Sequence, residues 1–287
     1  MGAGHVVVLV VAMTMAAPSW LAAQGAASAT PASAAWPPAI ADNSFLIEEA
    51  YNQEAGVVQF IVNAVRARPD GDWLMSFTNE WPVPGMRHQF SYAVPYAALS
   101  GGRADGLGDV QLNYRYQALE ESRHGIAFAP RFSISLPTGD DARGLGMGVT
   151  GYQIGLPLSK RLASHVAGHI NLGATLWPGA TVGRTEQGAR TRDVGAFTQG
   201  GSAIWLVSPV FNAFLEVVAS QVQVTGEGGP TRWSHQLLLN PGVRAAMNTA
   251  AGQLVLGAST PIGVTADSPD PSLFIYLSWE MAVWHPR

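Results

Sequence analysis

Polar and apolar residues alternate strictly in the stretch GLGDVQLNYRYQAL, residues 106–119. One side carries Val110, Leu112, Tyr114, Tyr116 and Ala118, and the other side carries Gln111, Asn113, Arg115 and Gln117. A period of two predicts a β-strand with one apolar and one polar face. The same period returns along most of the chain, so it predicts the architecture as well as one element.

Alternating segments between residues 57 and 284 predict about twelve strands. Their expected ranges are 57–65, 72–81, 86–95, 109–119, 125–136, 150–159, 164–176, 196–207, 210–224, 232–247, 252–260 and 273–284. The links between them differ in length. Links such as 82–85 and 208–209 are short, whereas links such as 96–108, 137–149 and 177–195 are long. Short turns on one rim and long loops on the other are typical of outer-membrane barrels.

The direction in which the apolar face points decides between a soluble and a membrane protein. Eight strands already make a closed barrel just wide enough for side chains to fill. Twelve strands with the apolar set inward would leave a void, so we expect the apolar set to face lipid and the polar set to face the lumen. We therefore predict an all-β fold, a closed antiparallel up-and-down transmembrane β-barrel of about twelve strands. A soluble, periplasmic two-sheet binding protein is the alternative.

Composition favours the membrane barrel. Charged residues make up 13% of the chain, against about 25% in typical soluble domains, and Lys160 is the only lysine. A net charge of −4 gives no indication of nucleic-acid binding. The chain has no cysteine, which excludes disulfides and thiol chemistry.

The N-terminal region predicts export. Residues 6–17, VVVLVVAMTMAA, are too short for a membrane-spanning helix and match the apolar core of a signal peptide, which we expect over residues 1–23. Residues 24–56 are expected to form a flexible lead-in, with a short helix over Asn43–Glu54 in the periplasm or tucked into one end of the fold. The barrel would occupy residues 57–287, in the bacterial outer membrane.

The polar face gives the candidate pore-lining residues: Glu80, Arg87, Gln89, Gln111, Arg115, Arg131, Gln153, His169, Glu216, Arg244 and Glu280. Buried charges need partners, so we expect some of these arginines to pair with lumen glutamates on neighbouring strands. Arg115 and Arg131 lie on adjacent strands and should share an acid or stay hydrated. Closure of the barrel should bring Glu280 near Gln59 or Asn63.

Other chemistry is less well supported. His169 and Asn171 share the polar face of one strand, as do Ser133 and Ser135 on another, so an outer-membrane phospholipase-like hydrolase is a rival interpretation. Nothing in the sequence pairs a serine with His169. The loop acids Asp105, Asp140 and Asp141 are typical of turns, and we expect no metal site and no cofactor.

Aromatic residues near the predicted strand ends would form the two interfacial girdles. They are Trp73, Trp81, Tyr92, Tyr116, Trp177, Trp205, Trp233 and Trp284.

Six motifs carry a resemblance that spans most of residues 43–287. They are IEEAYNQE (Ile47–Glu54), GLGDVQLNYRY (Gly106–Tyr116), APRFSISLPTGD (Ala129–Asp140), GYQIGLPLSK (Gly151–Lys160), NPGVR (Asn240–Arg244) and FIYLSWE (Phe274–Glu280). Their order resembles a family of bacterial outer-membrane transporters named for the meta-pathway of phenol degradation.

The resemblance implies a barrel that takes up small molecules. We expect a passive channel, without enzymatic activity, for small and aromatic or apolar solutes. Its partners would be the lipid bilayer, the solute and the outer-membrane insertion machinery. A structural or adhesive barrel is the remaining alternative. One departure is that Trp284 is followed by His285, Pro286 and Arg287, whereas outer-membrane strands usually finish on an aromatic residue.

Overall fold

The structure is a computed structural model that describes residues 40, 44–83, 85–101, 104–186, 188–225 and 231–283. The predicted signal peptide and Trp284 lie outside the described residues. No helix among the described residues is long and apolar enough to cross a membrane.

In the described part of the chain fifteen strands form one sheet. Of these, β4, β6 and β14 are short segments beside longer neighbours, so the barrel has twelve main strands. The strands are β1 (Val57–Arg66), β2 (Trp73–Pro82), β3 (His88–Leu99), β4 (Ala104–Leu107), β5 (Gln111–Tyr116), β6 (Ala127–Phe128), β7 (Arg131–Ser135), β8 (Gly151–Ala163), β9 (Val166–Thr185), β10 (Gly188–Ser208), β11 (Phe211–Thr225), β12 (Thr231–Thr249), β13 (Gly252–Ser259), β14 (Ile262–Gly263) and β15 (Leu273–Ala282). The helical turns α2 (Glu121–His124) and η2 (Asp141–Arg143) lie between strands.

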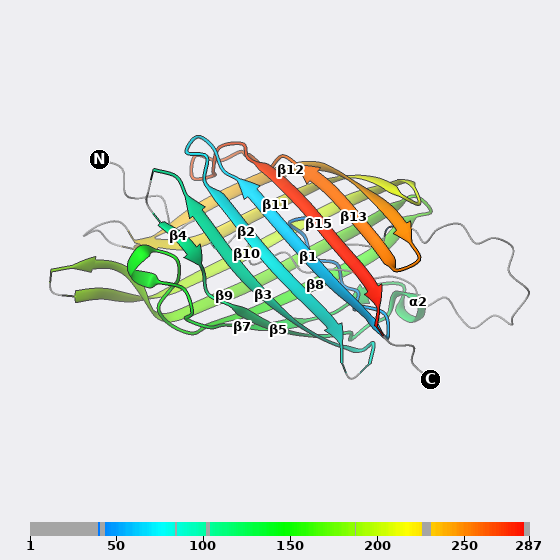
Figure 1. The fold of residues 1–287 in the computed structure, drawn as a ribbon, viewed down its shortest axis with the longest axis horizontal. Helices are drawn as coiled ribbons and strands as arrows, with labels where there is room; N and C mark the ends of the chain where they lie inside the picture. Colours follow the sequence, from blue (N-terminus) through cyan, green and yellow to red (C-terminus); the bar gives the residue numbers. More distant parts are fainter. Residues whose placement is uncertain are drawn as a thin grey trace, which may run out of the picture.

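The sheet closes on itself without a crossover. Each main strand pairs antiparallel with the next one along the chain, β11 pairs with β12, and β15 returns to β1 with Val57 opposite Ala282. Figure 1 shows the tilted strands, with α2 and the C-terminal end of β15 at one end and the tip of the β9–β10 hairpin at the other. The prediction of a closed up-and-down barrel is confirmed, and the two-sheet alternative is wrong.

Burial follows the predicted alternation. On β8 the outward residues Tyr152, Ile154 and Leu156 are exposed, whereas Gln153 is buried. On β9 the outward Ile170 and Leu172 are exposed in the same way. A belt of exposed apolar side chains therefore surrounds the barrel, while polar side chains point inward, as a bilayer-spanning barrel requires.

Two segments depart from the predictions. Most of residues 177–195, expected as a loop, belong to β9 and β10, which continue as a long hairpin beyond the other strands. Its pairing shifts register between Arg190 and Thr191 and again between Arg192 and Val194. These β-bulges interrupt the period of two, which is why the pattern did not show a strand there.

The second departure is the lead-in. Residues 44–53, here called the lumen segment, form bends and extended backbone instead of the expected helix, and all ten are buried. Their backbone N–H groups donate to side chains of the barrel wall, described below, so they are not available for helical hydrogen bonds. The segment lies inside the barrel at the end with the shorter turns, the short-turn end, which faces the periplasm in barrels of this class.

Candidate functional site: the barrel interior

Residues on both sides of the lumen segment lie at the same rim of the barrel. The Ile40 N–H donates to the Pro209 carbonyl in the β10–β11 turn at 2.8 Å. After the segment, the Val57 N–H donates to the Glu54 carbonyl at 3.0 Å, and β1 begins. The segment therefore crosses the short-turn half of the interior and returns to the wall as the first strand.

An aromatic anchor holds the start of the segment. The Phe45 ring stacks on Phe274 and Tyr276 of β15, with centroids 5.1 and 4.9 Å away, and its edge meets Phe214 of β11 at 4.6 Å. Gly257 of β13 leaves the space for this ring, because a Cβ there would lie 2.3 Å from the Phe45 ring. Phe45 is 1% exposed, and the wall residues around it are aromatic, so the wall is apolar at this point.

The next residues are held by a wall carboxylate. The N–H groups of Leu46 and Ile47 both donate to Glu216 Oε1 at 2.9 Å. The other oxygen, Glu216 Oε2, accepts from Asn240 Nδ2 at 2.5 Å. A carboxylate that accepts several N–H groups is a strong acceptor, so Glu216 fixes where the segment turns into the lumen.

Side chains of other parts of the wall continue the pattern. Asn171 of β9 makes a reciprocal pair with the Glu48 backbone, since Oδ1 accepts from Glu48 N and Nδ2 donates to Glu48 O, both at 2.7 Å. Ser159 Oγ accepts from Ala50 N at 2.7 Å. Further along, Gln117 Oε1 accepts from Asn52 N at 2.9 Å and Gln89 Oε1 accepts from Gln53 N at 2.7 Å.

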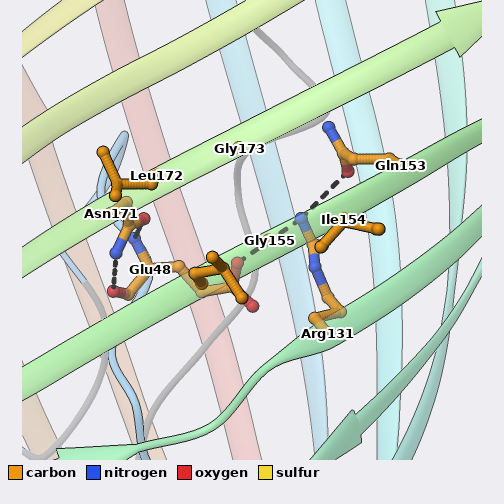
Figure 2. A pocket seen from close by; sticks show the side chains of 9 residues that line it. Glu48, Arg131, Gln153, Ile154, Gly155, Asn171, Leu172 and Gly173 are labelled. Carbon is orange, nitrogen blue, oxygen red and sulfur yellow. Dashed lines mark hydrogen bonds and ion pairs between the residues drawn. The ribbon is translucent and has the colours of Figure 1, made fainter.

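An ionic clamp fixes the middle of the segment. Glu48 Oε1 lies 3.3 Å from Arg115 Nη1 on β5, and Glu48 Oε2 lies 3.4 Å from Arg131 Nη2 on β7. Arg115 also donates from Nε to Asn52 Oδ1 at 2.9 Å, from Nη1 to the Glu49 carbonyl at 3.2 Å and from Nη2 to the Tyr51 carbonyl. Figure 2 shows Glu48 and Arg131 meeting beside Gly155.

Glu49 faces a second group of basic residues. Its Oε1 atom lies 3.6 Å from His169 Nε2 and 3.9 Å from Arg244 Nη2. Both glutamates of the segment therefore lie against basic side chains of the wall.

The structure places most of the candidate pore-lining residues inside the barrel. Those buried there are Glu80, Gln89, Gln111, Arg115, Arg131, Gln153, His169, Glu216 and Arg244. Glu280 is half-buried and lies directly opposite Gln59 in the β1–β15 register, as predicted.

Arg87 departs from its predicted place. It lies in the turn before β3, its side chain is 54% exposed, and its Nε atom is 3.6 Å from Glu120 Oε1. The predicted strand began at residue 86, whereas β3 begins at His88. Arg87 was therefore assigned to the inward face of a strand that does not include it.

The predicted ion pairs are partly right. Arg115 and Arg131 share an acid, as expected. That acid is Glu48 of the lumen segment, whereas the prediction named glutamates on neighbouring strands. Glu80, a wall acid, instead accepts from Gln89 Nε2 at 2.6 Å.

Ser159, His169 and Glu49 contact one another in the order serine, histidine, acid, as in a catalytic triad, but the resemblance goes no further. Ser159 Oγ lies 2.7 Å from His169 Nδ1, and Glu49 approaches the other ring nitrogen. However, Ser159 is fully buried beneath the segment, and its Oγ already accepts from Ala50 N. A nucleophile needs a reacting carbon and an oxyanion site beside it, and here the lumen segment occupies that place.

Trp177 marks a different environment near the long-loop end. Trp177 was predicted to lie in a girdle, but it is 3% exposed and packs inward with Val194, Ala196 and Val222. The reason is that β9 continues past residue 176, where the predicted strand ended, and the alternation of its side chains turns Trp177 inward. Met147 and Val149 of the β7–β8 loop pack against this cluster.

Asp109 anchors the loop that brings those two side chains in. Its Oδ1 accepts from Gly139 N at 2.9 Å and its Oδ2 accepts from Met147 N at 2.8 Å. Burial raises the pKa of the Asp109 carboxyl above its ordinary value, and these backbone N–H groups oppose the rise.

Other girdle candidates face outward. Trp205 and Trp233 are exposed, and Trp233 stacks on Phe197 at 5.9 Å. Trp81 packs against Phe90 and Tyr92 on the neighbouring strand, with centroids 6.3 and 5.5 Å away. The described residues contain no group of three or more acids and histidines placed to hold a metal ion.

The sequence did not identify Phe45, Glu48 and Glu49 as functional residues. One signal was available: four predicted inward arginines needed acidic partners, and the acids Glu48 and Glu49 stood shortly before the first strand.

Comparison with solved structures identifies the fold. The NanC porin is 10% identical, with a TM-score of 0.53, over 77% of this chain and 98% of that chain. An outer-membrane channel from Pseudomonas putida F1 is 14% identical, with a TM-score of 0.55, over 81% of this chain and 97% of that chain. This is the fold of an outer-membrane β-barrel channel. The belt of exposed apolar side chains around the barrel is what a membrane-spanning barrel of this fold presents to lipid. No protein-family model and no curated protein matches the chain.

Proposed function

We propose that this outer-membrane barrel is a passive channel for small solutes, with aromatic or apolar molecules as the preferred class. The observation that carries the proposal is a closed barrel with a polar interior, which the lumen segment occupies. Twelve strands enclose more space than wall side chains alone fill. A purely structural barrel has no need of a wide interior.

The preference for aromatic solutes rests on the resemblance to the phenol-pathway transporter family, through motifs such as GLGDVQLNYRY and LPTGD. The lumen segment would have to move, in part or completely, for a solute to pass the short-turn half.

The test is conductance and solute entry with the purified full-length protein. We expect heat-modifiable migration in gels, small or intermittent currents in planar bilayers, and entry of small solutes but not of large oligosaccharides into proteoliposomes. Proteoliposomes with the denatured chain are the control. A correctly folded barrel that passes no current and no solute at any voltage would contradict the proposal and favour a structural or adhesive role.

A further inference from the structure

Two arginines stand side by side inside the barrel. Arg115 on β5 and Arg131 on β7 are directly opposite in the strand register, and they are 2% and 3% exposed. Two neighbouring guanidinium groups away from water require an anion between them. Glu48 of the lumen segment is that anion, and it is the one carboxylate of the described residues within ion-pair distance of Arg131.

The fit between Glu48 and Arg131 is incomplete. A guanidinium fork binds a carboxylate best through two parallel N–H donors. Glu48 instead meets each arginine through one nitrogen, at 3.3 and 3.4 Å. Arg131 Nη2 also donates to Gln153 Oε1 at 3.0 Å, while Arg131 Nε, which is buried, has no hydrogen-bond partner within the described part of the chain.

A small cavity adjoins this place. Its volume is about 10 Å³, and Glu48, Arg131, Gln153 and Asn171 line it together with Gly155 and Gly173. That volume holds about one water molecule. Figure 2 shows Gly155 of β8 and Gly173 of β9, which are opposite each other in the strand register, near Glu48 and Arg131. A carboxylate ligand could therefore reach Arg131 only if the Glu48 side chain withdrew.

We propose that Arg131, with Arg115 and Gln153, is a binding site for the carboxylate of a small organic acid, and that Glu48 occupies it as an internal ligand. The proposal rests on the channel function above and names the solute class: small carboxylates, including aromatic ones. An entering carboxylate takes the place of Glu48 between the arginines, so the buried positive charge is never left alone. A neutral solute cannot make this exchange.

The two arginines have different parts in the exchange. Arg115 makes most of its bonds to the segment itself, through Asn52 and the carbonyls of Glu49 and Tyr51. Arg131 makes one contact to the segment, through Glu48. Arg131 therefore binds the solute, and Arg115 positions the segment.

The experiment is a competition between an internal and an external carboxylate. Binding of benzoate and of benzyl alcohol, which has the same ring without the charge, is measured by calorimetry on the purified full-length barrel in detergent. Replacing Glu48 by Gln removes the internal ligand, so benzoate affinity should rise about tenfold or more, because an occluded site binds in proportion to its open fraction. Benzyl alcohol should bind no better to E48Q than to the unmodified barrel.

Control variants separate the site from general effects. Glu186→Gln makes the same chemical change on an exposed turn of the β9–β10 hairpin and should leave benzoate binding unchanged. Adding Arg131→Gln to E48Q should abolish the gain. If E48Q fails the heat-modifiability test of folding, Glu48→Asp, which keeps the charge on a shorter side chain, should give a smaller gain in the same direction.

Benzoate affinity that stays unchanged or falls in E48Q would overturn the proposal, as would an equal gain for benzyl alcohol. The channel function fails separately. Improved benzoate binding in a barrel that passes no current would leave the site standing without the channel, whereas current without any benzoate effect would leave the channel without the site.

Discussion

The lumen segment is held at two places that differ in chemistry. At its start, Phe45 lies among Phe214, Phe274 and Tyr276, in contacts that depend on shape and on removal from water. A few residues later, Glu48 lies between Arg115 and Arg131, in contacts that depend on charge and direction. Apolar contact supplies affinity with little regard to direction, whereas buried ion pairs are sensitive to partner and geometry. The aromatic anchor therefore retains the segment, and the ionic clamp is the part that a charged solute can replace.

The largest expected effect comes from removing the anchor. Phe45→Ala should weaken docking of the segment by about 3–5 kcal/mol, the usual range for deleting a buried aromatic ring. The barrel itself should remain folded, because its strands pair without the segment. Limited proteolysis should then cut the chain within residues 44–53, and bilayer currents should increase. Phe197→Ala, on the lipid-facing surface, is the matched control and should change neither. Loss of the whole barrel would show that the segment is needed for the wall itself.

Removing the clamp should have a somewhat smaller effect. Arg115→Leu deletes several hydrogen bonds to the segment, but Arg131 still neutralises Glu48, so we expect a loss of about 3 kcal/mol. Hydrogen exchange should show faster exchange of the segment amides, while amides in the β11–β12 ladder keep their protection. Arg87→Leu, on the exposed turn before β3, should stay within about 0.5 kcal/mol of the unmodified barrel. An equal loss of protection in every strand would contradict a role confined to the segment.

The shape of the anchor can be tested without touching the segment. Gly257→Ala would place a Cβ 2.3 Å from the Phe45 ring, and overfilling of this kind costs about 1–3 kcal/mol. At Gly195 of β10 the nearest heavy atom to an added Cβ is 3.4 Å away, an ordinary contact, so Gly195→Ala serves as the control. Both variants are compared by the temperature at which the segment becomes accessible to protease. A segment equally accessible in both would show that the wall adjusts freely.

The fold was predictable because a barrel wall has only two sides. Alternation such as that of β8 assigned each residue to lipid or lumen, and all twelve main strands were found. The alternation was less informative at Arg87, where a turn replaced the expected first residues of a strand, and at Trp177, where the wall turns apolar side chains inward beneath a loop. The two-residue period of polar and apolar residues cannot by itself distinguish a residue that faces water from one that faces another part of the chain.

The site was harder to predict because its acidic half lies outside the repeating pattern. Glu48 and Glu49 fell early in the helix predicted over Asn43–Glu54, where acids are favourable. Their partners are more than sixty residues away in sequence, as with Glu48 and Arg115, which are 67 residues apart. The alternation indicated that Arg115 and Arg131 needed an acid, but it could not show that this acid enters from the end of the barrel.

The smallest expected effect concerns the first residue of the segment. Ser44 Oγ donates to Ser202 Oγ on β10 at 2.8 Å, and neither group is charged. Ser44→Ala should therefore weaken docking by only about 1 kcal/mol, the usual contribution of a neutral hydrogen bond. The proteolysis assay used for Phe45→Ala measures both changes on one scale. If Ser44→Ala weakened docking as much as Phe45→Ala, then the Ser44–Ser202 hydrogen bond would hold the lumen segment as strongly as the Phe45 ring does.

The short connection between the segment and β1 sets the concentration at which a solute must compete. Glu54 and the two residues after it are all that separates residue 53 from the first strand, and the Val57 N–H bonds back to the Glu54 carbonyl. A group held on so short a tether has an effective concentration in the millimolar range or above at its own binding site. Glu48 therefore competes for Arg131 like a carboxylate present at that concentration. An organic acid at lower concentration would occupy the site for only a small fraction of the time, in proportion to its concentration outside the cell.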